Sequence, residues 1–250
     1  INLSDNQIKL IDQNAFSHAS NIILLNLATN RIKDLSFLKS VPPIAKLNLN
    51  SNEIESLHDH LFDSLCYLSH LDLSLNKLKC ITNKQFNTDF KCSLQNIDLS
   101  KNHIEIVESN VFESFYSLEV IDFGENRLKK IDSRLFSKLK LLKTLNLCKN
   151  PLESIIDNET NLSPMFHLPK LTNLDLSYSN IKKLCKGSFE GLPNLLTLKI
   201  TDCQIEFKLA TLDENGNCTT GITRHYDSAA DWELSSSNYK YTWNRTKYLN

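Results

Sequence analysis

Four aspartates stand at equivalent points of a repeated Leu/Ile-Asp-Leu/Phe pattern, and their carboxylates are the most regularly spaced charged groups in the sequence. They are Asp72, Asp98, Asp122 and Asp175. A row of carboxylates attracts basic side chains, so the pattern favours binding of a partner with a basic patch. The alternative is that Leu-Asp-Leu-Ser is a common filling of short strands, in which the aspartate only aids local hydrogen bonding.

Histidines and cysteines give no comparable indication of catalysis or metal binding. His58 and His60 are the only close histidine pair, with no cysteine or further histidine at ligand spacing. The sequence has no glycine-rich phosphate-binding loop and no Gly-x-Ser-x-Gly elbow. The acidic residues are spread evenly by the repeat and do not converge. We therefore expect a protein that is not an enzyme and needs no cofactor.

The aspartates belong to a nine-residue pattern that returns from one end of the chain almost to the other. In the copy at residues 94–102 (LQNIDLSKN), apolar residues stand at positions one, four and six, aspartate at five and asparagine at nine. Position nine returns after 22 to 29 residues. Its residues are Asn6, Asn30, Asn52, Asn76, Asn102, Asn126, Asn150, Ser179 and Cys203. A period of this length matches the leucine-rich repeat pattern, which has one strand in each repeat.

The pattern predicts an α/β solenoid. Alternation of apolar and polar residues indicates a short strand in each repeat. Each repeat returns to the same edge, so the strands should pair in parallel, about 4.8 Å apart. The return path is wider than a strand, so we expect a horseshoe with the parallel sheet on its concave face and irregular loops or short helical turns on its convex face. A phenylalanine recurs on the return path, and we expect Phe16 to point inward.

The asparagines at position nine should form a structural ladder. A side-chain amide can donate to and accept from backbone groups that the bend out of the sheet leaves unpaired. Ser179 and Cys203 lack that carbonyl-plus-amine pair, so the ladder should weaken at the C-terminal end. The ladder residues are Asn30, Asn52, Asn76, Asn102, Asn126 and Asn150.

Side chains at position five should point out from the concave side of the sheet. Curved solenoids commonly use this face for binding. An exposed tyrosine is a typical anchor at interfaces, so Tyr178, beside Asp175, is a further candidate. The predicted concave binding face contains His70, Asp72, Asp98, Asp122, Asp175 and Tyr178.

The periodicity divides the chain into two parts. Residues 1–208 hold about nine repeats, and we expect a truncated array because Ile1 already stands at position four of a repeat. Residues 209–250 lose the period. A solenoid needs its terminal core covered, so this atypical C-terminal segment is a cap, an island inserted in a longer array, or a poorly ordered end. No run of eighteen apolar residues is present, so we expect no membrane contact within the chain.

Glycosylation sequons and cysteines favour a secreted or cell-surface protein. Asn158 and Asn161 fall in the unusually long repeat, where an insertion should bulge outward. Seven cysteines leave at least one unpaired within the chain. Cys80 and Cys92 are the preferred disulfide, with Cys66–Cys92 as the alternative, and Cys185–Cys218 is a second candidate; most cysteines could instead be small buried hydrophobes. The five sequon asparagines are Asn2, Asn158, Asn161, Asn217 and Asn244.

The 24-residue period with its recurring phenylalanine resembles the typical class of extracellular leucine-rich repeats, and most of all Toll and Toll-like receptor ectodomains. Those proteins also combine irregular repeat lengths, sequons, in-repeat cysteine pairs and convex-side prolines. The resemblance implies the ectodomain of a single-pass innate-immune or developmental receptor, whose horseshoe binds a ligand and forms a receptor dimer. The alternative is a secreted or matrix-associated adhesion protein without a signalling role.

The expected partner is a protein or another extracellular ligand, held on the concave or lateral face. The formal net charge of −1 lacks the electrostatic footprint of a nucleic-acid binder.

Overall fold

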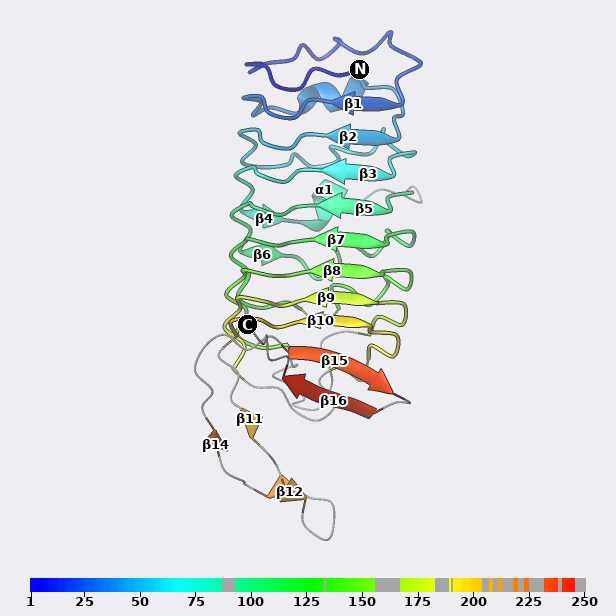
Figure 1. Cartoon of the computed structure of the whole chain (residues 1–250). Helices are drawn as coiled ribbons and strands as arrows, with labels where there is room; N and C mark the ends of the chain where they lie inside the picture. The colour runs from blue at the N-terminus through cyan, green and yellow to red at the C-terminus, as the bar shows by residue number, and fades with distance from the viewer. Residues whose placement is uncertain are drawn as a thin grey trace, which may run out of the picture.

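The computed structural model describes residues 1–86, 93–132, 134–155, 167–182, 189 and 191–203, and the backbone of six short strands between residues 207 and 245. The array is a coil of stacked repeats whose strands lie one below another (Figure 1). Eight of them form one parallel sheet in the order β1-β2-β3-β5-β7-β8-β9-β10. Their bounds are β1 Leu24–Asn26, β2 Lys46–Asn48, β3 His70–Asp72, β5 Asn96–Asp98, β7 Val120–Asp122, β8 Thr144–Asn146, β9 Asn173–Asp175 and β10 Thr197–Lys199. The predicted leucine-rich repeat solenoid is confirmed.

Each strand consists of positions three, four and five of its repeat. Only position four is buried, as in β5, where Ile97 is 1 % exposed between half-buried Asn96 and Asp98. Successive side chains on a strand point to opposite faces, so the sheet has one face in the core and one face outside. The parallel register places equivalent residues side by side along the whole sheet. A bridge from Asn2 to Asn26 extends this register into the first repeat.

The core is one continuous cluster that no single repeat could bury. Leucine and isoleucine from positions one, four and six stack along the coil, and phenylalanines of the return paths fill its other side. Phe16 is 7 % exposed and belongs to this core, as expected. The Phe112 ring stacks on Phe136 at 6.3 Å and meets Phe115 edge-on at 5.9 Å. Adjacent repeats therefore depend on one another for burial of their apolar surface.

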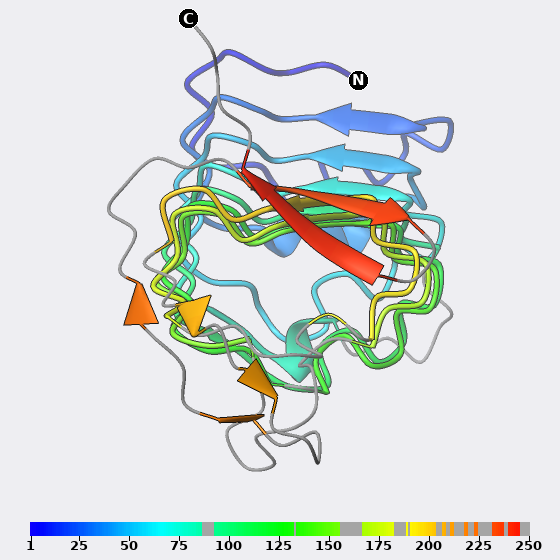
Figure 2. The same ribbon diagram turned by 60° about the horizontal axis from the view of Figure 1, so that its bottom comes forward.

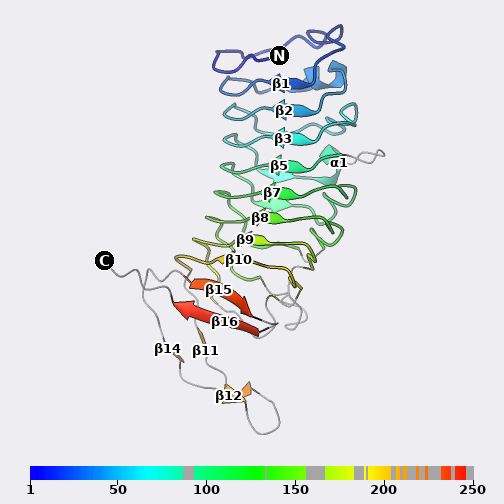
Figure 3. The same ribbon diagram turned by 45° about the vertical axis from the view of Figure 1, so that its right-hand side comes forward.

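The return paths contain little regular structure. One path forms a short 3-10 helix, Ser36–Ser40, and another forms α1, Asn83–Phe86. A second, two-stranded parallel sheet joins β4, Cys80–Ile81, to β6, Ile106–Val107. In Figure 3, α1 lies to one side of the stacked strands of the main sheet.

The residue at position eight of every repeat has a left-handed backbone conformation. These residues have φ between 51° and 57°, although none is glycine: Asp5, Thr29, Ser51, Leu75, Lys101, Glu125, Lys149, Tyr178 and Asp202. The N–H of each residue before the last repeat donates to the carbonyl of position seven in the next repeat, as from Leu75 to Ser100 at 3.0 Å. The left-handed region costs an L-residue about 1 kcal/mol, and the inter-repeat hydrogen bonds hold the turn in place.

The segment after residue 203 adds no further parallel rung among its described strands. It forms three antiparallel pairs: β11 (Phe207–Lys208) with β14 (Thr223–Arg224), β12 (Thr211–Leu212) with β13 (Cys218–Thr219), and β15 (Trp232–Ser237) with β16 (Lys240–Arg245). Strand β15 lies beside β10, and the β15–β16 hairpin crosses the end of the coil in Figure 2. The reading of residues 209–250 as a cap, an inserted island or a poorly ordered end stays a prediction. Among the described residues, no helix is long and apolar enough to cross a membrane.

Candidate binding face

Position five places the aspartates in one row on the outer face of the sheet. Asp72 on β3 is the direct neighbour of Asp98 on β5, which is the direct neighbour of Asp122 on β7. Neighbouring strands are about 4.8 Å apart. Three carboxylates are therefore stacked in register, and Asp175 lies on β9, beyond Asn146 of β8.

One oxygen of each carboxylate is used by the turn that follows the strand. Asp72 Oδ1 accepts a hydrogen bond from the Ser74 N–H at 2.9 Å, and Asp98 Oδ1 accepts one from Ser100 at 2.9 Å. Asparagine at position five makes the same bond, as from the Asn50 N–H to Asn48 Oδ1 at 2.9 Å. Local hydrogen bonding therefore explains a short oxygen-bearing side chain at position five, but not the negative charge.

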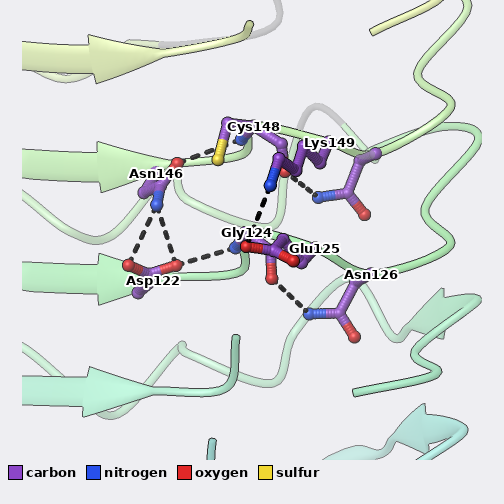
Figure 4. A network of polar contacts seen from close by, with 8 residues as sticks. Asp122, Gly124, Glu125, Asn126, Asn146, Cys148 and Lys149 are labelled. Atoms are coloured by element: carbon purple, nitrogen blue, oxygen red, sulfur yellow. Dashed lines mark hydrogen bonds and ion pairs between the residues drawn. The ribbon is translucent and has the colours of Figure 1, made fainter. Parts of the chain in front are cut away.

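Asp122 is bound by the neighbouring repeat as well. The Asn146 amide donates to both of its carboxylate oxygens, at 3.0 and 2.9 Å, and the Gly124 N–H donates to Oδ1 at 2.7 Å (Figure 4). A Cβ on Gly124 would lie 2.9 Å from Asn146 Nδ2 and 3.0 Å from Asp122 Oδ1. The glycine thus leaves the room that this amide needs. Asp175 is also partnered, by Lys199 Nζ at 3.8 Å.

Asp72 and Asp98 differ from the other two aspartates. Among the described residues, each of their carboxylates is hydrogen-bonded only by the serine two residues further on, through its N–H and its hydroxyl. In the part of the chain that the structure describes, no lysine or arginine lies within ion-pair distance of either carboxylate. We call these two residues the open pair.

The electrostatic surroundings of the open pair disfavour an uncompensated negative charge. Burial raises the pKa of Asp98, the charges of Asp122 and Asp72 raise it further, and the hydrogen bonds from Ser100 oppose this shift. His70, one strand position before the row, has its pKa lowered by burial and then by the charge of Lys46. It is therefore uncharged at neutral pH and does not neutralise Asp72.

A shallow hollow of about 370 Å³ lies over this part of the sheet. Its apolar lining includes Leu24, 42 % exposed, and Val120. Its polar lining includes Lys46, His70, Asn96 and the aspartates of β3, β5 and β7. The hollow has the size of a few side chains, and its polar side carries three carboxylates against one lysine.

Two exposed apolar side chains border the sheet at position eight. Tyr178, expected from the sequence, is 51 % exposed, and Leu75, which the sequence analysis did not single out, is 44 % exposed. Leu75 ends the turn that follows Asp72. The missed signal is visible in the sequence, because apart from Tyr178 the other residues at this position are polar or charged.

The six ladder asparagines at position nine lie at the same edge but are buried, whereas Asn6 in the first repeat is exposed. Asn102 Nδ2 donates to Leu99 O at 3.1 Å and to Leu73 O of the preceding repeat at 3.0 Å, and its Oδ1 accepts from the Leu78 N–H at 3.0 Å. Equivalent bonds hold Asn30, Asn52, Asn76, Asn126 and Asn150.

This ladder changes at the C-terminal end. The Leu152 N–H bonds to the carbonyl of Asn150, and Ser179 Oγ instead lies 3.2 Å from Cys203 Sγ. Cys203 Sγ still donates one hydrogen bond to the preceding repeat, to Leu176 O at 3.3 Å. The hydroxyl and thiol thus make fewer bonds than an amide does.

Several predicted sites cannot be compared with the structure. Cys92, Asn158, Asn161, Cys185 and Asn217 lie outside the described residues, and Cys218 and Asn244 are described only in their backbone. Cys80 is exposed on β4, and its pairing with Cys92 stays a prediction. Asn2 is exposed at position five of the first repeat.

The histidine pair shows no metal site. His60 Nδ1 lies 3.0 Å from Asp63 and His58 Nε2 lies 3.5 Å from Asp34, so each histidine meets a different carboxylate. Within the described ranges, no three histidine, cysteine or acidic side chains are grouped to hold a metal ion.

Comparison with known proteins identifies the repeat. The sequence matches the family described as "Leucine rich repeat" over residues 42–87, 92–152 and 163–207. Osteomodulin of Rattus norvegicus is 30 % identical over 209 residues, which are 82 % of this chain and 36 % of osteomodulin. The chain thus spans about a third of the length of that relative.

Solved structures share the fold at lower identity. One is from the Toll–Spatzle complex of Drosophila, described as a hub in development and innate immunity, with a TM-score of 0.66 and 24 % identity over 79 % of this chain and 27 % of that one. Another is internalin C2 of Listeria monocytogenes, with a TM-score of 0.64 and 22 % identity over 80 % of this chain and 79 % of that one.

Proposed function

Because the chain belongs to the leucine-rich repeat family, we propose that it is a non-catalytic recognition module that binds an extracellular protein ligand on the outer face of its main sheet. The uncovered sheet face with its hollow carries this proposal. Side chains at positions three and five of the strands stay exposed or half-exposed, while position four is buried. A rigid sheet presents such side chains with little loss of conformational freedom on binding.

We propose further that this module is part of the ectodomain of a Toll-like receptor. The repeat style and the sequons support this reading, as does the fold shared with Toll, which was solved with Spatzle bound. The second candidate is a secreted or matrix-associated adhesion protein, favoured by the similarity to osteomodulin. The full-length transcript discriminates between them: a membrane span and a signalling domain after the array support the receptor, and a stop codon after a cap overturns it.

A glycan placed on the sheet face tests the binding role directly. Asp98→Asn creates a glycosylation sequon together with Leu99 and Ser100, so secretion from a glycosylating host attaches a bulky sugar at the centre of the face. Asn48 shows that asparagine fits this position. We expect the glycosylated chain to lose binding to ligands found by screening the wild-type chain against a panel of secreted and cell-surface proteins.

The control is Asp98→Asn combined with Ser100→Ala, made in the same host. This chain carries the same asparagine without a sequon, so it shows the effect of removing the Asp98 carboxylate alone. Loss of binding beyond that effect in the glycosylated chain is assigned to the sugar. Ligands that bind the glycosylated chain as well as the wild type would show that the sheet face is not the binding site.

A further inference from the structure

The row of aspartates on the sheet face is not uniform, and the difference locates a smaller site within it. Asp122 is bound by Asn146, and Asp175 pairs with Lys199. The open pair, Asp72 and Asp98, has neither kind of partner. A ligand cation meeting the first two would have to displace an existing partner, whereas the open pair offers its charge directly.

The hollow adds shape to this charge. It spans β1 to β7, so the open pair borders it together with the apolar Leu24 and Val120. A docking ligand would bury apolar surface beside the carboxylates and exclude water from them. Removal of water strengthens an ion pair relative to one on an open surface. The hollow therefore favours a ligand that is basic and apolar at neighbouring points.

Leu75, three residues after Asp72, provides an independent observation. It is 44 % exposed and has φ of 54°, a backbone conformation that asparagine and glycine adopt more readily than leucine. Its exposed side chain gains little from the core, so neither the turn nor burial accounts for a leucine. Residues that are unfavourable for local structure are often retained for function.

We propose that the open pair, the adjoining hollow and Leu75 together bind an extended basic segment of a protein partner, in which arginine or lysine side chains meet Asp72 and Asp98 and a neighbouring apolar side chain packs on Leu75. Charge complementarity selects this occupant over an acidic protein or a nucleic acid. The inference rests on the proposed binding role of the sheet face and names the chemistry of its partner.

Synthetic peptides test the charge requirement without knowledge of the natural ligand. The probe is a 12-residue Gly/Ser peptide carrying four arginines and two leucines, and its partner peptide has glutamate in place of arginine. Binding is followed by fluorescence anisotropy at roughly physiological salt, where exposed charges are screened beyond about 8 Å. We expect the arginine peptide to bind and the glutamate peptide not to bind.

The decisive variant is Asp72→Asn with Asp98→Asn, produced in bacteria so that the new sequons stay unglycosylated. Asparagine keeps the hydrogen bond to the turn, as Asn48 and Asn146 show. We expect affinity for the arginine peptide to fall about tenfold, or 1.4 kcal/mol. Asp12→Asn with Asp59→Asn removes the same charge from exposed return-path positions and should change affinity less than twofold.

Leu75→Asn tests the apolar contact by measuring peptide affinity beside thermal stability. A purely structural role of Leu75 would not make the two change in opposite directions. The variant should unfold at a higher temperature, because asparagine suits the left-handed turn, yet bind the arginine–leucine peptide several-fold more weakly. Thr29→Asn is the matched control, since Thr29 is exposed at the equivalent turn with φ of 54°. It should gain stability with no change in binding.

Equal binding by wild type and the unglycosylated double aspartate variant would overturn the inference, as would equal binding of the arginine and glutamate peptides. The proposed function would survive either result if the glycan introduced by Asp98→Asn still blocked the natural ligand. Conversely, a natural ligand indifferent to that glycan would overturn the proposed function itself, whatever the peptides show.

Discussion

Two rows of polar side chains run along the same sheet, and they follow opposite rules. The six ladder asparagines of the position-nine row are buried, with Asn102 4 % exposed, and their amides bond to backbone groups of two repeats. The position-five row is half-exposed and varies between asparagine, aspartate and lysine. The amides of the first row form hydrogen bonds with backbone groups that water cannot reach. A side chain of the second row needs only to supply one oxygen that accepts a hydrogen bond from the turn.

The difference shows where this repeat constrains its sequence. A buried N–H or carbonyl without a partner costs about 1–3 kcal/mol, so position nine tolerates little change until the last repeats. At position five the charge is optional, because Asn48 supports its turn as Asp72 does. Residue choice there is open to selection by a partner.

Disruption of the core shared by both rows should have the largest effect. Leu99 lies between Asp98 and Asn102 in sequence and is fully buried. Leu99→Asp would bury a charge without a partner, and we expect loss of about 5 kcal/mol or more, enough to unfold the central repeats. Circular dichroism during heating measures this. Leu99→Ala should cost only about 3 kcal/mol, and an unchanged melting curve for Leu99→Asp would refute the register.

Exchange of residues along the position-nine row sharpens the comparison. Asn102→Ser would leave the Leu78 N–H without its acceptor and would remove one of the two amide donors to Leu73 O, at a cost of about 2–3 kcal/mol. The reverse change, Ser179→Asn, should instead stabilise by about 1 kcal/mol by extending the ladder. Urea unfolding gives both values, and effects of the same sign would contradict our account of the C-terminal end.

Gly124→Ala tests whether the two halves of the position-five row really differ. The new methyl group would crowd Asn146 and Asp122, so we expect a loss of about 1 kcal/mol from overpacking and from the displaced amide. Ser100→Ala, at the equivalent point of the preceding repeat, crowds nothing and loses only the hydroxyl bond to the half-exposed Asp98, so we expect it to cost less. Thermal unfolding compares the two, and equal losses would remove the special role of the glycine.

The smallest effect concerns the pH dependence of Asp98. Burial raises its pKa in the folded chain, so the folded state binds a proton more readily than the unfolded state. Stability from this group therefore falls as pH rises through the folded pKa. Unglycosylated Asp98→Asn should be slightly more stable than wild type at pH 7, and that difference should vanish as pH falls below the ordinary aspartate pKa. A constant difference across that range would contradict the shift.

The fold followed from the sequence because burial of positions one, four and six in a shared core requires nearly every feature of the solenoid. The strand positions and the parallel sheet were predicted from that periodicity. The short 3-10 helix at Ser36–Ser40 and the β4–β6 pair were not, because the return paths have no period that selects a conformation.

The candidate binding site was less predictable, because the differences among its aspartates arise from contacts between repeats. The aspartates were predicted as one uniform row, yet Asp122 and Asp98 differ through the room that Gly124 leaves for Asn146. Such a contact joins residues 24 apart in the chain, and the pattern within one repeat carries no sign of it. The left-handed turns were missed for a similar reason, since glycine is absent and only the bonds to the next repeat hold them.

The hydrogen bonds of the strands, the left-handed turns and the asparagine ladder all lie at the inner edge of the coil. That edge is nearly inextensible, because lengthening it breaks many bonds together. Return paths are joined by fewer backbone bonds, among them the β4–β6 pair, and their buried phenylalanines make apolar contacts that can shift with little change in energy. We therefore expect the side of the coil that carries the sheet to be stiff and the return paths to be more compliant, so that the coil bends about its inner edge. A ligand bound to the sheet could then alter the curvature of the array without breaking the hydrogen bonds between repeats.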